Sequence, residues 1–185
     1  MDENDIKEII KAFSDAAKRA VKAGFKVIEI HSAHGYLMHS FLSPLANKRN
    51  DSYGGDIHGR MRLLLEVVDA VRSVIPEDMP LFCRISAVDG IENGWEIEDS
   101  VILSEKLGEQ GVDVIDCSAG GISGAPLFRV NKSGKPMKTS MDRGPGFQGP
   151  FAEKVKKESG MKTMAVGVIV DPHQAEQVLK NDKAD

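Results

Sequence analysis

Short apolar segments alternate with amphipathic segments along the chain, and this alternation constrains the fold more than any other feature. Four short segments rich in apolar and β-branched side chains are predicted to be strands, at residues 26–31, 81–86, 112–118 and 163–168. Helical spacing predicts a first helix from a cap at Asn4 or Asp5 to Gly24, and further helices at 60–75, 97–110, 150–159 and 172–180. Such an alternation favours the α/β class, with a parallel sheet covered by helices.

Two architectures fit this pattern, a doubly wound open sheet and a (β/α)8 barrel. No GxGxxG motif follows the first strand, which weighs against a dinucleotide-binding sheet. Polar residues end several strands, where barrel enzymes carry their chemistry: His31, Arg84 with Ser86, and Asp116 with Ser118. We therefore expect a partial TIM barrel. Four strands instead of eight, in a chain that opens with a helix and closes after one, predict that residues 1–185 form an incomplete barrel domain that lacks strands at both ends.

Composition narrows the classes of partner. The net charge of -4 and the pI of about 5.8 disfavour nucleic acid, which is bound through basic patches. No apolar run reaches the roughly 18 residues of a membrane span, and the acidic N-terminus lacks a signal-peptide core. We therefore expect a cytoplasmic protein with no membrane partner, in which both cysteines are reduced thiols.

One cluster of chemically active side chains follows the first strand. Strand alternation places Glu29 and His31 on the inner face, and His34 and Tyr36 follow in the loop. Two imidazoles and a phenol at one rim can donate hydrogen bonds to a substrate oxygen. A phenol keeps its proton at neutral pH, so Tyr36 is a candidate general acid. The alternatives are a core histidine satisfied by a neighbour, or metal ligation by His31 and His34 with Glu29.

The second strand supplies a further candidate. Alternation sends Phe82, Arg84 and Ser86 inward, and an inward arginine needs an anion, a dipole or a structural ion pair. Cys83 and Cys117 fall on helix-facing positions, where we expect buried core thiols without a redox role.

Three segments carry a resemblance to a known family. They are EIHSAHGYLMHSFLSPLANKRNDSYGGDIHGRMRLLLEVVDAVR, which begins at Glu29, then LFCRISAVDG and GVDVIDCSAGG. Together they resemble the Old Yellow Enzyme family of flavin mononucleotide (FMN) ene-reductases, and most of all its bacterial NADPH-dehydrogenase-like branch. The similarity runs from about Asp5 to the last residue.

This resemblance implies a barrel with noncovalent FMN at its carboxyl mouth, reduced by NADPH or NADH. Hydride then passes from the flavin to an activated C=C bond of an α,β-unsaturated substrate such as an enone or nitroalkene. By position, His31 and His34 match the substrate-binding pair, Tyr36 the proton donor, and Arg84 an arginine beside the flavin. Gly167 matches part of the phosphate-binding region, with a tight turn as the alternative. Many relatives are dimers or tetramers, so a homo-oligomer is expected.

Other matching segments have structural roles in this interpretation. Residues Asn47, Arg49, Asp51 and Tyr53 are expected to be loop scaffold, tied down by Arg60. The segment 120–149, with Lys132, Lys135, Lys138 and Arg143, is expected to be a solvated surface loop, with a position over the active site as the alternative. Two other functions remain open: a catalytically inactive half-barrel that binds or assembles, and a metal-dependent lyase or hydrolase.

Overall fold

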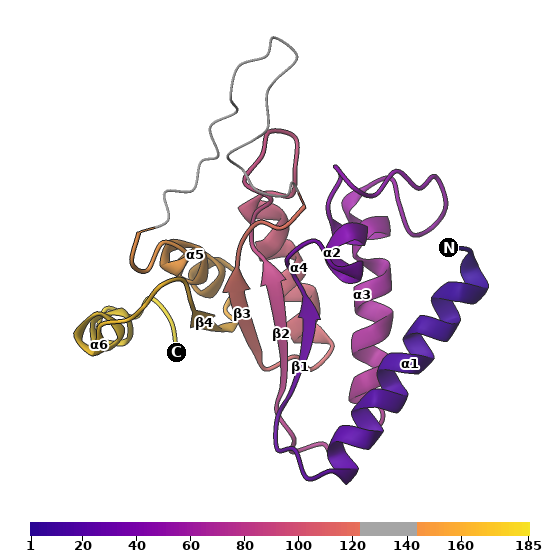
Figure 1. Cartoon of the computed structure of the whole chain (residues 1–185), viewed down its shortest axis with the longest axis horizontal. Coiled ribbons are helices and arrows are strands. Elements are labelled where there is room, and N and C mark those ends of the chain that lie inside the picture. Colours follow the sequence, from indigo (N-terminus) through magenta and orange to yellow (C-terminus); the bar gives the residue numbers. More distant parts are fainter. Residues whose placement is uncertain (123–143) are drawn as a thin grey trace.

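The computed structural model describes residues 1–122 and 144–185, and its centre is one parallel sheet. The strands are β1 (Ile28–Ser32), β2 (Leu81–Ser86), β3 (Val114–Ser118) and β4 (Lys162–Ala165), and they pair in chain order. The arrowheads of β1, β2 and β3 lie at the same end of the sheet (Figure 1). The expected α/β fold with four strands is confirmed, and the polar strand ends share one rim.

Six helices connect and flank the strands in the described residues. They are α1 (Glu3–Lys22), α2 (Leu37–Leu42), α3 (Ile57–Arg72), α4 (Ile97–Glu109), α5 (Gly149–Ser159) and α6 (Pro172–Lys180). The first begins two or three residues earlier than expected, because Asp2 caps it and forms a capping box with Asp5. The last begins as predicted, since the Asp171 side chain accepts a hydrogen bond from the His173 amide and Pro172 follows the cap.

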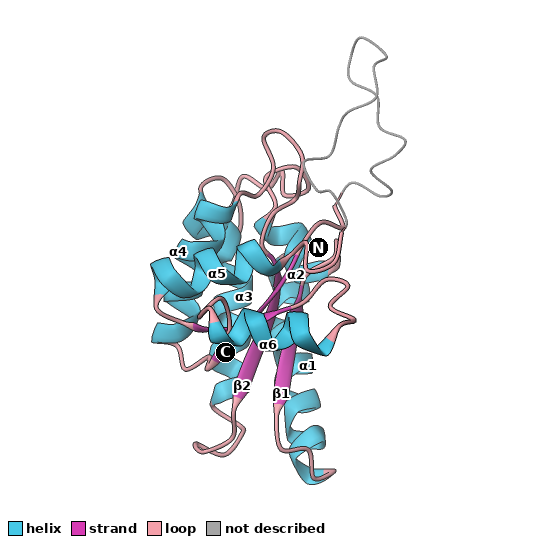
Figure 2. Cartoon of the chain, turned by 90° about the vertical axis from the view of Figure 1, so that its left-hand side faces the viewer, coloured by secondary structure: helices cyan, strands magenta, loops and turns pink. Residues whose placement is uncertain are grey.

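The two faces of the sheet differ sharply. Helices α3, α4 and α5 lie on the same side of β1 and β2 (Figure 2). The strand residues facing them are fully buried, including Ile30, Leu81, Cys83, Ile85, Ile115 and Cys117. The opposite face carries Glu29 and His31, which are exposed, and Arg84, which is half-buried. The predicted inward and outward alternation is therefore confirmed, and the inner face is the more open of the two at Glu29 and His31, whereas Ser86, Asp116 and Ser118 on it are buried.

Several predicted boundaries are wrong. The helix expected at 60–75 begins and ends three residues earlier, because Asp56 caps it through the Gly59 amide. Helix α2 was not predicted, because six residues are too few to show helical periodicity. The last strand ends at Ala165, so Gly167 lies beyond the strand rather than at its end.

No helix within the described residues has the length and apolar character needed to cross a membrane.

Candidate active site

The three side chains of the predicted cluster meet at the carboxyl rim of the sheet. His31 is the penultimate residue of β1, and its ring centroid is 5.2 Å from that of His34 and 5.4 Å from that of Tyr36. The Tyr36 side chain is 66% exposed, so its phenol is open to a ligand that approaches from the inner face. The arrangement holds two imidazoles and a phenol within reach of one small molecule.

His34 is held by hydrogen bonds from the two neighbouring strands. Its backbone adopts a left-handed conformation with φ of 60°, which is uncommon for a residue other than glycine. Its amide donates to Ser86 Oγ at 2.9 Å, and its Nε2 lies 2.6 Å from Ser118 Oγ. Ser86 Oγ in turn donates to the Gly120 carbonyl at 2.7 Å. The ends of β1, β2 and β3 are thus joined through His34 and two serines.

The turn after β1 requires a glycine at position 35. Gly35 has φ of 79°, and a Cβ built on it would collide with the Gly121 carbonyl oxygen. Gly121 itself has φ of 113°, and a Cβ on it would overlap the backbone of His34. The loops after β1 and β3 therefore touch backbone to backbone, and neither position accommodates a side chain.

The surroundings of the two imidazoles favour their neutral form. Partial burial lowers the pKa of His31 and of His34, and the nearby Arg84 cation lowers both further. A neutral imidazole has one N–H donor and one acceptor nitrogen. Because Ser118 occupies Nε2 of His34, Nδ1 is the ring nitrogen left without a hydrogen bond to the described residues.

Arg84 lies beside this cluster in an ion pair whose partner, Asp116, the sequence did not identify. It pairs in register with His31 on β1 and Asp116 on β3, and its Nε is 3.3 Å from Asp116 Oδ2. Burial raises the pKa of Asp116, opposed by the Arg84 charge. Burial and the Asp116 charge also raise the pKa of Glu29. The inner face is therefore lined by coupled charges, which include the structural ion pair considered for Arg84.

The ion pair leaves hydrogen-bonding capacity unused. Among the described residues, the buried atoms Arg84 Nε and Asp116 Oδ1 have no aligned hydrogen-bond partner. The Arg84 side chain is 32% exposed, so its guanidinium also reaches the open inner face. A donor group with spare capacity beside two neutral imidazoles fits the polar edge of a planar heterocycle such as a flavin.

Gly167 lies away from this group, in a turn after β4. Its φ is 104°, and a Cβ on it would lie 2.9 Å from Gln148 Oε1 and 3.0 Å from a ring carbon of Phe147. Its carbonyl accepts a hydrogen bond from the Gly146 amide at 2.7 Å. These contacts account for a glycine through a tight turn, and a phosphate-binding role for Gly167 remains a prediction.

The other candidates of the sequence analysis lie as follows. Among residues 1–122 and 144–185, no three His, Cys, Asp or Glu side chains cluster as metal ligands, so Glu29 does not complete a ligand set with His31 and His34. Cys83 and Cys117 are free thiols with no exposed surface, and burial raises the pKa of Cys83 to about 12. Lys132, Lys135, Lys138 and Arg143 lie outside the described residues.

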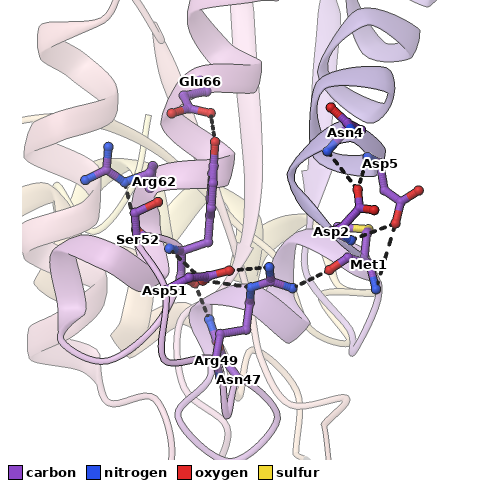
Figure 3. A network of polar contacts seen from close by, with 11 residues as sticks. Met1, Asp2, Asn4, Asp5, Asn47, Arg49, Asp51, Ser52, Arg62 and Glu66 are labelled. Atoms are coloured by element: carbon purple, nitrogen blue, oxygen red, sulfur yellow. Dashed lines mark hydrogen bonds and ion pairs between the residues drawn. The ribbon is translucent and has the colours of Figure 1, made fainter.

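The loop between α2 and α3 has the contacts of a scaffold. Asn47 Nδ2 donates to the Phe41 and Tyr53 carbonyls, and Arg60 Nε and Nη1 donate to the Leu42 and Gly55 carbonyls. Arg49 binds the Asp51 carboxylate and the Met1 carbonyl, which joins the loop to the start of α1 (Figure 3). These side chains are occupied by the loop and the segments that flank it, in agreement with the expected scaffold role.

A parallel βα sheet with imidazole, phenol and guanidinium groups at its carboxyl rim is the arrangement of a barrel-type enzyme. The model of the NADH:flavin oxidoreductase / NADH oxidase family matches residues 1–185, and the chain belongs to this family. The family is one of flavin-dependent oxidoreductases, as the sequence resemblance implied.

Relatives support this assignment in both sequence and structure. The chain is 47% identical over 185 residues to the NADPH dehydrogenase of Geobacillus thermodenitrificans and 44% identical to that of Bacillus subtilis. It spans about half the length of each, 50% in both cases. Its fold matches a 2-naphthoyl-CoA reductase complex with a TM-score of 0.86 at 26% identity, covering all of this chain and 27% of that one. It matches a morphinone reductase variant bound to tetrahydroNAD with a TM-score of 0.73 at 25% identity, covering 45% of that chain.

Proposed function

We propose that this chain carries the substrate-side machinery of an FMN-dependent oxidoreductase that reduces activated C=C bonds, such as those of enones and nitroalkenes. The observation that carries the proposal is the convergence of His31, His34 and Tyr36 at one rim, beside Arg84. Bound FMN would supply the hydride-transfer chemistry, with NADPH or NADH as the reductant. The relatives named NADPH dehydrogenase support this choice of cofactor and reductant.

The residues of the cluster have separate roles in this proposal. His31 and His34 bind the carbonyl or nitro oxygen of the substrate and stabilise the negative charge that develops on it during reduction. Lowered pKa values suit this role, because neutral imidazoles donate hydrogen bonds without protonating the oxygen fully. Tyr36 donates the proton that the substrate α-carbon receives, from an exposed phenol beside His31.

Arg84 binds the polar edge of the flavin and contributes positive charge near it. Its Asp116 partner lies 3.3 Å from Nε and holds the side chain in place, while the partly exposed guanidinium reaches the inner face. A fixed cation beside a redox ring favours the reduced, more negative state of that ring. Gly167 is proposed to lie near the FMN phosphate, through its left-handed backbone.

The test is a titration of FMN into the full 185-residue chain, followed by flavin fluorescence. Saturable quenching with micromolar affinity is expected, followed by loss of visible absorption on anaerobic addition of NADPH and its recovery on addition of 2-cyclohexenone. Tyr36→Phe should slow the enone step by about 10²- to 10⁴-fold and leave NADPH oxidation unchanged. No quenching and no NADPH oxidation would instead support an inactive half-barrel that binds or assembles, and size-exclusion chromatography would then show whether it self-associates.

A further inference from the structure

A third histidine, His39, lies close to the rim and is fully buried, and the reaction proposed above does not use it. His39 is on α2, five residues after His34, and its Nε2 is 2.8 Å from Asp89 Oδ1. Neither side chain has any exposed surface. A buried histidine and carboxylate are costly unless both are fully hydrogen-bonded, so the partners of each atom show what the pair does.

Asp89 is saturated with donors. Its Oδ1 accepts from His39, and its Oδ2 accepts from Ser43 Oγ at 2.5 Å and from the Trp95 amide at 2.8 Å. Burial alone would raise the pKa of Asp89, but these three hydrogen bonds outweigh it and lower the pKa. The carboxylate is therefore ionised, and every group around it is a donor.

This environment fixes the protonation of His39. Because Asp89 is an acceptor only, Nε2 of His39 carries the hydrogen. Its Nδ1 lies 2.9 Å from the Gly35 amide, which can only donate, so Nδ1 is the acceptor nitrogen of a neutral ring. The ring thus connects the buried carboxylate to the backbone of the turn that carries His34 and Tyr36.

We propose that His39 and Asp89 are positioning residues that hold the left-handed backbone of His34 and Gly35, and with it the turn that carries Tyr36. Left-handed backbone at His34 is strained and persists only when its surroundings determine it. The Gly35 amide is fixed by His39, and the His34 amide is fixed by Ser86. Asp89 selects the tautomer of His39 that can accept, and so acts on the turn through His39 without touching the substrate site.

The catalytic role of the turn held by His39 rests on the proposed function, but the test of the positioning itself needs no cofactor and no turnover. In the full chain labelled with nitrogen-15, the imidazole spectrum is expected to show His39 as the Nε2–H tautomer. The Gly35 amide is expected to be protected from hydrogen exchange. Finding His39 as the Nδ1–H tautomer or as an imidazolium at neutral pH would overturn the proposal with no variant required.

Asp89→Asn tests the link from the carboxylate to the turn. Ser43 and the Trp95 amide both need the oxygen of the new asparagine as acceptor. The asparagine NH2 group must therefore face His39, and Nε2 of His39 must become an acceptor. Nδ1 then carries the hydrogen, faces the Gly35 amide as a second donor and loses the bond. We expect the tautomer to switch and Gly35 exchange to accelerate about tenfold relative to the α3 core amides.

Two further variants separate positioning from general stability. His39→Gln can rebuild both hydrogen bonds, with its oxygen toward Gly35 and its NH2 toward Asp89, and should restore Gly35 protection that His39→Leu removes. Ser104→Ala is the matched control, since Ser104 loses one buried hydroxyl bond within α4 and does not touch this network. Equal loss of Gly35 protection in Ser104→Ala and Asp89→Asn, or unchanged protection in a folded Asp89→Asn, would refute the proposal.

Discussion

Arg84 Nε lies 3.3 Å from Asp116 Oδ2, and the pair bridges β2 and β3 directly beside His31 on β1. The two charges act in opposite directions on the neighbouring imidazole. The Arg84 cation lowers the pKa of both His31 and His34. The Asp116 charge raises the pKa of His31 and does not act on that of His34.

This opposition predicts a pattern of titration shifts. In the unaltered chain, both histidines should titrate below the ordinary value of 6.5 in imidazole NMR spectra, since burial also lowers each pKa. Arg84→Gln should raise both midpoints, because the cation that disfavours protonation is removed. Asp116→Asn should lower the His31 midpoint further and leave that of His34 in place. Arg62→Gln, on the outer surface of α3, is the control. If it shifted the His31 and His34 midpoints as much as Arg84→Gln does, this account would be contradicted.

The contact between Gly35 and Gly121 predicts a large difference between two similar substitutions. Gly35→Ala adds both positive-φ strain and a collision with the Gly121 carbonyl, whereas Gly55→Ala at φ of 76° enters open space. We expect Gly55→Ala to lower the free energy of unfolding by about 1–2 kcal/mol. Gly35→Ala should cost about 1–3 kcal/mol more, from overpacking.

Urea unfolding followed by circular dichroism measures both values. Gly55→Ala serves as the matched control because it has the same backbone conformation without the collision. Equal losses for the two variants would show that the backbone approach between the loops after β1 and β3 does not constrain the site.

The two faces of β1 predict opposite tolerance at adjacent positions. Ile30 is 3% exposed and packs toward the helices, so Ile30→Ala should lower the free energy of unfolding by about 2–5 kcal/mol. Glu29 is exposed on the inner face, and partial desolvation by its neighbours together with the Asp116 charge raises its pKa. Glu29→Ala should therefore change stability by less than about 0.5 kcal/mol. A chemical denaturation curve for each variant decides between this assignment of faces and its reverse.

Burial of the thiols predicts their chemistry. Because Cys83 and Cys117 have no exposed surface and burial raises both pKa values, that of Cys83 to about 12, neither forms the reactive thiolate near neutral pH. Ellman's reagent should therefore label neither in the folded chain and both in urea. Rapid labelling without denaturant would mean that the helices separate readily from the face of the sheet that carries Cys83 and Cys117.

The sequence predicted the parts of this structure that depend on local periodicity. Alternation within single strands correctly placed His31 and Arg84 on the inner face and Cys83 and Cys117 on the outer face. The spacing His-x-x-His-x-Tyr correctly predicted that the three rings converge. Each of these features is set within a few residues, so a single segment carries the signal.

Contacts between distant segments were not predictable in this way. The pairing of His39 with Asp89 joins residues 50 positions apart, and His39 lies on a helix too short to show a period. Ser118 meets His34 across β2, which requires the register of three strands. The sequence placed the polar ends of β2 and β3 at one rim, but it did not show that Ser86 and Ser118 are the residues there that bind His34.

The order β1-β2-β3-β4 has a consequence for how the molecule forms. Each described strand pairs with its immediate successor in the chain, so none of these pairings needs a strand that is synthesised later than its partner's neighbour. The entropic cost of closing a loop grows with its length, so pairing with the next strand costs less than pairing with one further along the chain. The sheet can therefore grow by one strand at a time during synthesis on the ribosome, with each new strand added to an edge that already exists.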